Sequence, residues 1–130
     1  MENFKMNPIG WFEIYVEDMD RAAKFYETVL GLVAQPLPMP NSDGNMEMRV
    51  LPGDMADAGA TGALVKMDGM KGGAGGTIIY FVTEDCGVAE AKAAAAGGKV
   101  HQPKMSIGEH GFCSLVADTE GNVIGFHSMQ

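Results

Sequence analysis

The sequence predicts an α+β fold made of two tandem βαβββ modules, and three observations lead to this prediction. A length of 130 residues suits one compact domain. A hydrophobic content of 46% and a charged content of 20% are ordinary for a globular protein. Finally, Val16 ends the first predicted strand and its counterpart Val82 lies 66 residues later. Gly31 and Gly97, which each end a predicted helix, have the same spacing. A repeat of half the chain indicates a duplicated module that shares its core with its copy.

The first module begins with a predicted strand over residues 11–16, which is rich in aromatic and β-branched side chains. Because side chains alternate along a strand, three face each way. One face carries Trp11, Glu13 and Tyr15, and the other carries Phe12, Ile14 and Val16.

A helix over residues 19–30 follows this strand. Asp18 is suited to cap its first turn, because a carboxylate accepts hydrogen bonds from unpaired N–H groups. The apolar residues recur at amphipathic helical spacing, as Ala22, Phe25, Tyr26 and Val29. Gly31 stands where a left-handed cap would end the helix.

Three further strands complete the first module, which covers about residues 10–67. They are predicted over 32–35, 46–51 and 62–67, separated by a proline-bearing loop over 36–45 and a turn-rich connection over 52–61.

A glycine-rich linker over 68–76 leads into the second module, which covers about residues 77–128. The linker contains KGGAGGT, but no GK[ST] follows and the chain then enters a strand, so a phosphate-binding loop is rejected. A strand over 77–83, an alanine-rich helix over 88–96 and strands over 99–102, 111–117 and 122–128 repeat the order. Residues 1–130 are therefore expected to form a single domain.

The charge balance argues against nucleic acid as a partner. Nine Lys and Arg residues against seventeen Asp and Glu residues give a net charge of −8, which favours cationic ligands over phosphates. The N-terminus has no apolar signal region, and no apolar run approaches the about 18 residues of a membrane span. Cys86 and Cys113 have no metal-ligand spacing. We therefore expect a cytoplasmic protein with free thiols and no membrane contact.

Two segments resemble the vicinal-oxygen-chelate superfamily of glyoxalases, bleomycin resistance proteins and extradiol dioxygenases. They are the opening WFEIYVEDMDRAAKFYETVLGL and the closing VADTEGNVIGFHS. The resemblance implies an incomplete barrel around a cavity, a small-molecule ligand and a homodimer. In catalytic members, a divalent metal is held by two His and two Glu side chains, or by two His and one Glu.

Carrying the family's ligand positions onto this chain gives four residues that fit a metal poorly. They are Trp11, Lys66, Thr77 and Gly125. Zinc, iron and manganese need carboxylate, imidazole or thiolate donors at about 2.0–2.3 Å. The resemblance therefore implies a member without the usual metal site, and no cofactor is predicted, although a metal held by other residues stays an alternative.

Glu13 and His127 are the candidate catalytic residues. Glu13 is either a buried carboxylate suited to general-base catalysis, or an acid that is hydrogen-bonded to Trp or Tyr or faces solvent. His127 shares a strand face with Gly125, so it could form an acid/base pair or a displaced metal site with Glu13, or simply be exposed near the C-terminus. Cys113 and His110 are expected on opposite strand faces, which disfavours a nucleophile pair between them.

The predicted ligand pocket is lined by Trp11, Glu13, Tyr15, Lys66, Thr77, Gly125 and His127. Aromatic walls with a carboxylate suit a planar cation, so the leading hypothesis is a protein that binds a small aromatic or cationic molecule. The first alternative is a metal-dependent lyase like glyoxalase I, or a dioxygenase, with a non-standard ligand set. The second is metal-independent acid/base catalysis by Glu13.

Overall fold

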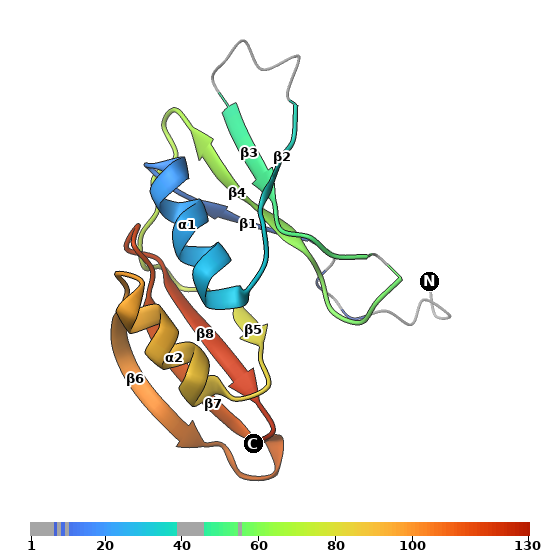
Figure 1. Ribbon diagram of the computed structural model, residues 1–130, viewed down its shortest axis with the longest axis vertical. Coiled ribbons are helices and arrows are strands. Elements are labelled where there is room, and N and C mark those ends of the chain that lie inside the picture. Colours follow the sequence, from blue (N-terminus) through green and yellow to red (C-terminus); the bar gives the residue numbers. More distant parts are fainter. Residues whose placement is uncertain (1–6, 8, 10, 39–45, 55) are drawn as a thin grey trace.

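The computed structural model describes residues 7, 9, 11–38, 46–54 and 56–130 (Figure 1). The strands of its first half are β1 (Phe12–Tyr15), β2 (Gln35–Pro36), β3 (Met46–Val50) and β4 (Gly62–Met67), with helix α1 (Met19–Leu30) between β1 and β2. The second half has β5 (Tyr80–Val82), α2 (Cys86–Ala95), β6 (Lys99–Ser106), a 3-10 turn (Gly108–His110), β7 (Phe112–Ala117) and β8 (Val123–Ser128). The predicted α+β class and the βαβββ order of each half are confirmed.

The strands form two four-stranded sheets with equivalent topology, β1-β4-β3-β2 and β5-β8-β7-β6. In each sheet the first strand runs parallel to the last, and the other pairs are antiparallel. Each helix covers one face of its own sheet, and α1 and α2 lie side by side (Figure 1). No helix covers the opposite face of either sheet, which we call its open face (Figure 1). A closed cavity between the sheets stays a prediction.

Helix α1 begins and ends as predicted from the sequence. The carboxylate of Asp18 accepts a hydrogen bond from the backbone N–H of Arg21 at 3.0 Å. Gly31 has a φ of 70°, and its N–H donates to the carbonyl of Glu27. The left-handed backbone favours glycine at this position, because a side chain would strain it.

Two predicted strands are shorter or shifted in the structure. β2 contains only Gln35 and Pro36, because the preceding Ala34 donates its N–H to the Glu27 carboxylate of α1 rather than to a strand. β5 begins only at Tyr80, so the predicted strand residues 77–79 lie outside it. Residues 39–45 of the predicted loop lie outside the described residues.

Two elements of the second half are longer than predicted. α2 begins at Cys86 because the Asp85 side chain caps its first turn, accepting from the Gly87 N–H at 2.9 Å. β6 continues to Ser106, through Pro103. Its register against β7 shifts between Gln102 and Met105. A proline is tolerated at such an irregular edge because it has no N–H to pair.

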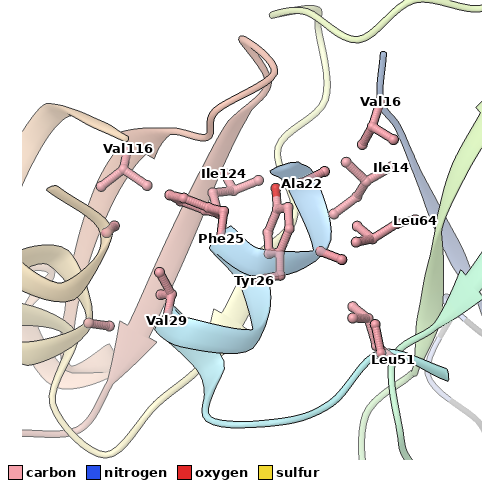
Figure 2. Packing of buried hydrophobic residues seen from close by; sticks show 14 of the residues in the cluster. Ile14, Val16, Ala22, Phe25, Tyr26, Val29, Leu51, Leu64, Val116 and Ile124 are labelled. Carbon is pink, nitrogen blue, oxygen red and sulfur yellow. The ribbon is translucent and has the colours of Figure 1, made fainter. Parts of the chain in front are cut away.

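The hydrophobic core lies between the two sheets and around α1. Figure 2 shows Phe25 and Tyr26 of α1 between two groups of apolar side chains. One group comes from the first sheet and includes Leu64, and the other comes from the second sheet and includes Val116. A core shared in this way explains why neither module would bury its apolar face alone.

The turn between β7 and β8 joins the second module to the first through Glu120. Its carboxylate accepts hydrogen bonds from the backbone N–H groups of Glu17 and Asp18, both at 3.0 Å, and from the guanidinium of Arg21 at 2.6 Å. Burial alone would raise the pKa of Glu120, but these bonds outweigh it and lower the pKa to about 2. We call this set the Glu120 junction.

A second polar contact between the modules is buried. The Tyr26 hydroxyl donates to the Asp118 carboxylate at 2.6 Å, and burial and the charge of Asp118 raise the pKa of Tyr26 well above its ordinary value. Asn122 links the same carboxylate to the carbonyl of Tyr15 at 3.1 Å and accepts from the N–H of Gly73 at 2.7 Å. The turn thus fixes the orientation of β1, which carries the candidate site.

Candidate ligand-binding site

The open face of the first sheet carries a hydrogen-bonded cluster of three residues, which we call the Glu13 cluster. The Tyr15 hydroxyl donates to Oε1 of Glu13 at 2.7 Å, and Nε1 of Trp11 donates to Oε2 at 3.3 Å. Glu13 is exposed, so it corresponds to the hydrogen-bonded, solvent-facing interpretation and not to the buried general base. The hydrogen bond to Glu13, together with burial and the negative charge, raises the pKa of the Tyr15 hydroxyl.

Strand alternation explains why these three side chains meet. Ile14 and Val16 point into the core, with exposures of only 5% and 1%, so Trp11, Glu13 and Tyr15 point to the open face. Both donors are held next to one carboxylate, and each of its oxygens accepts one hydrogen bond. The carboxylate is therefore oriented before any ligand arrives.

A small packed apolar cluster lies beside the Glu13 cluster on the same side of the sheet. β4 aligns Ala63 with Glu13 and Val65 with Tyr15, and β3 aligns Met48 with Val65. The buried residues of this apolar cluster are Met48, Ala63 and Val65, with Tyr15, Met46 and Met67 packed at its edge. This side of the sheet thus combines a fixed negative charge, two aromatic rings and two partly buried methionines, Met46 and Met67, over a packed apolar layer.

Lys66 does not join the Glu13 cluster. It follows Val65 on β4 and therefore faces the other side of the sheet, where it is aligned with Glu47. The next residue of β4, Met67, is the one that faces the open side, and its side chain has no donor atom suited to a hard metal ion. The assignment of Lys66 to the pocket followed from family spacing, which did not define the strand register.

On the second sheet, the ring of Tyr80 covers Gly125. The two residues are aligned on β5 and β8, and a Cβ atom at Gly125 would overlap the Tyr80 ring. Tyr80 is 48% exposed, so the ring presents an aromatic surface on the open face of this sheet. Thr77 is exposed and precedes β5 by three residues, so it is not held by the sheet ladder.

His127 lies on the same open face as Gly125, and its Nε2 is 2.6 Å from the carbonyl oxygen of His110. Glu13 and His127 belong to different sheets, and no hydrogen bond joins them in the part of the chain that the structure describes. His110 lies in the 3-10 turn and not at the start of β7, and its side chain is exposed. Cys86, the first residue of α2, is buried, whereas Cys113 is partly exposed.

Two arrangements were not predicted from the sequence. One is the Tyr80 ring over Gly125, which required the parallel register of β5 and β8. The other is the row formed by Met105, Cys113 and His127 across β6, β7 and β8. The hairpin turn over residues 118–122 could have indicated the pairing of Cys113 with His127, since residues equally distant from a turn are aligned in a hairpin.

The four family ligand positions do not fit a zinc, iron or manganese ion. These positions carry an indole, an ammonium group, an exposed hydroxyl and a glycine. Together they supply no convergent donors of the kind that these ions need. Among the described residues, no group of three or more His, Cys, Asp and Glu side chains is arranged to hold a metal ion.

A recess of about 310 Å³ lies between the helices, away from both open sheet faces. It is lined by α1 residues such as Lys24 and Thr28, by Ala95 at the end of α2 and by Thr119. Arg21 also borders it, but its guanidinium is bound by Glu120. No helix among the described residues has both the length and the apolar character for crossing a bilayer.

Comparisons with known proteins agree with this architecture. Residues 9–42 match the family described as bleomycin resistance protein-like N-terminal. A curated protein of Mycobacterium tuberculosis, named "Putative glyoxylase CFP32", is 26% identical over 124 residues, which are 94% of this chain and 46% of that protein. The chain thus spans about half the length of the curated relatives it matches.

Solved structures show the same fold. A member of the glyoxalase/bleomycin resistance protein/dioxygenase superfamily from Sphaerobacter thermophilus has a TM-score of 0.67 and 22% identity, covering 95% of this chain and 98% of the other. Glyoxalase I from Zea mays has a TM-score of 0.68 and 18% identity, covering 94% of this chain and 46% of the other. The chain therefore has the fold of the glyoxalase/bleomycin resistance/dioxygenase superfamily.

The shared fold leaves the chemistry to the site, because one fold serves many functions. In this chain, the β8 position that the resemblance assigns to a metal ligand is a glycine under an aromatic ring, and the corresponding β1 position is a tryptophan that donates to a carboxylate. The superfamily name is therefore not evidence of glyoxalase activity in this chain.

Proposed function

We propose that this chain binds a small aromatic cation on the open face of the first sheet, without a metal ion at the inherited ligand positions. The observation that carries the proposal is the Glu13 cluster, in which Trp11 and Tyr15 both donate to one exposed carboxylate. A negative charge between two aromatic rings is complementary to a planar positive ion.

Each part of the cluster contributes a different interaction. The Glu13 carboxylate pairs with the positive charge, and its direction is set by the two donors. The Trp11 ring, with 45% of the residue exposed, can stack on a planar ligand and add about 0.5–2 kcal/mol of cation–π attraction. The partly buried methionines beside Tyr15, Met46 and Met67, can cover the rest of the ligand and remove it from water.

The overall charge of the chain also favours a positively charged ligand. A net charge of −8 raises the local concentration of cations and lowers that of anions by long-range attraction and repulsion. Phosphorylated or carboxylated ligands are disfavoured for the same reason.

In this proposal, a second copy of the chain, or another domain of the same fold, completes the binding site. Trp11 on the first sheet and Tyr80 and Val82 on the second are exposed apolar residues on the open faces. Covering both faces would enclose the ligand and bury this apolar surface. We therefore expect a homodimer, which light scattering at several protein concentrations would detect.

The proposal is tested by isothermal titration of the protein with 1-methylquinolinium and, separately, with quinoline, both at the same neutral pH, at which quinoline is uncharged. We expect saturable binding of the cation, with Glu13→Gln weakening it about 10-fold or more, the loss that corresponds to about 1.4 kcal/mol. The matched control is Glu47→Gln, the same change on the opposite face of the same sheet. Equal loss in both variants, or no preference for the cation, contradicts the proposal.

A metal-dependent alternative is tested on the same preparations. The protein is titrated with Zn²⁺, Ni²⁺, Mn²⁺ and Fe²⁺. Stoichiometric binding tighter than micromolar that disappears in Glu13→Ala and His127→Ala would support a lyase or dioxygenase with a rebuilt ligand set, and would overturn the metal-free proposal.

A further inference from the structure

The open face of the second sheet carries three metal-binding side chains in one row. Met105 of β6 is aligned with Cys113 of β7, and Cys113 is aligned with His127 of β8. Residues aligned across an antiparallel pair point to the same face, with Cβ atoms about 4.5–5.5 Å apart. We call these three residues the Cys113 row.

The neighbouring residues confirm which face the row occupies. Ser114, next to Cys113, donates to the carbonyl of Cys86, the first residue of α2. Lys104, next to Met105, pairs with Asp85 at the start of α2. Both neighbours face the helix, so Cys113 and Met105 face the open side, where Met105 is 43% exposed and Cys113 is partly exposed.

The hydrogen bond of His127 leaves one ring nitrogen free for a metal. A carbonyl oxygen only accepts hydrogen bonds, so the contact of Nε2 with the His110 carbonyl requires a proton on Nε2. In the neutral ring, the lone pair is then on Nδ1. Metal-binding histidines in proteins commonly donate their other N–H to a backbone carbonyl in this way, which fixes the ring orientation.

We propose that the Cys113 row binds one soft, monovalent metal ion of the Cu(I) class, through Cys113 Sγ, Met105 Sδ and His127 Nδ1. The central cysteine lies between the two longer side chains, which can reach over it from both neighbouring strands. Thiolate and thioether donors select Cu(I), whereas Zn²⁺ gains little from a thioether. The thiol releases its proton to solvent when the ion binds.

This site is separate from both the proposed ligand site and the inherited metal position. The Glu13 cluster belongs to the other sheet. The inherited position on β8 is Gly125, which is covered by Tyr80. The acidic charge of the chain favours any cation, but the donor set of the row is what distinguishes a soft ion from a hard one.

The test is an anaerobic titration of the reduced protein with Cu(I), in competition with bicinchoninate. We expect one Cu(I) per chain and no comparable Zn²⁺ binding. Cys113→Ser, Met105→Leu and His127→Gln should each weaken Cu(I) binding about 10- to 100-fold or more. Two controls should leave it unchanged: Met70→Leu, an exposed methionine of the segment that links the two modules, and Cys86→Ala, which removes the buried thiol.

X-ray absorption at the copper edge provides a second measurement on the loaded protein. Both sulfur and nitrogen ligands are expected, with the nitrogen contribution lost in His127→Gln. Absence of competitive binding, or binding unaffected by Met105→Leu and His127→Gln, overturns the proposal. If Cys113→Ser does not fold, those two variants still decide, because their side chains lie on an open face.

Discussion

The aromatic ring of Tyr80 lies where any side chain at Gly125 would have to begin. These residues are aligned on the parallel strands β5 and β8, and Gly125 is buried beneath the ring. In metal-dependent relatives, the equivalent β8 position is expected to hold an acidic ligand. Here the absence of a Cβ atom allows an aromatic surface to form at that place.

Replacing Gly125 by alanine should therefore destabilise the fold. The new methyl group would displace the Tyr80 ring, and forced repacking of this kind costs about 1–3 kcal/mol. Urea denaturation measures the change in the free energy of unfolding. In a Tyr80→Ala background, where the ring is absent, the additional Gly125→Ala substitution should lower the free energy of unfolding only slightly. A cost that is the same with and without the ring contradicts this account.

The Glu120 junction predicts acid sensitivity. The pKa of Glu120 is about 2 in the folded chain and 4.5 ordinarily, so ionised Glu120 favours the folded state. This stability is fully present above pH 4.5 and is lost as the pH falls from 4.5 towards 2. Glu120→Gln should lower the free energy of unfolding by about 2 kcal/mol at pH 7, with a smaller difference from wild type in acid.

Denaturant unfolding at several pH values checks this prediction. Glu109→Gln is the control, since Glu109 is exposed in the 3-10 turn. Equal losses for Glu120→Gln at pH 7 and at pH 2.5 would mean that the charge of Glu120 does not stabilise the junction.

Removing the Tyr26 hydroxyl should destabilise the contact between the modules. In Tyr26→Phe, the buried Asp118 carboxylate loses a 2.6 Å hydrogen bond, at an expected cost of about 1–3 kcal/mol. Because the pKa of Tyr26 is raised on folding, its contribution is present below pH 10 and lost at higher pH. Wild type should thus lose stability above pH 10 more steeply than Tyr26→Phe. Parallel pH curves for the two proteins contradict the prediction.

Within the Glu13 cluster, Glu13→Gln should bring the pKa of the Tyr15 hydroxyl down towards its ordinary value of 10.0. The charge and the strong hydrogen bond that oppose ionisation of Tyr15 would both be weakened. NMR titration of the Tyr15 ring carbons follows this change directly. A Tyr15 titration curve identical in Glu13→Gln and wild type would show that the two groups are not coupled in solution.

The fold was largely predictable because its signals are local. Asp18 and Gly31 mark the ends of α1 by capping chemistry, and alternation in residues 11–16 separates core from open face. The register between strands has no such local signal, and this explains why Lys66 was expected on the wrong face. β2 is short because Ala34 pairs with Glu27 of the helix, a tertiary contact that strand propensity does not encode.

The candidate site was predictable in part for the same reason. Trp11, Glu13 and Tyr15 could be grouped because they alternate along one strand. The Glu120 junction was not predicted, because it depends on contacts between residues about 100 positions apart, such as Arg21 and Glu120. The extent of the domain, residues 1–130, and the closed cavity stay predictions.

The fluorescence emission of Trp11, the only tryptophan, gives the most direct measurement of metal-free ligand binding at the Glu13 cluster. The protein is treated with a chelator and titrated with 1-methylquinolinium, with and without added Zn²⁺. We expect a saturable change in emission with the same midpoint in both conditions, and weaker binding in Glu13→Gln. A midpoint seen only when the metal is restored, or no saturable change at all, contradicts it.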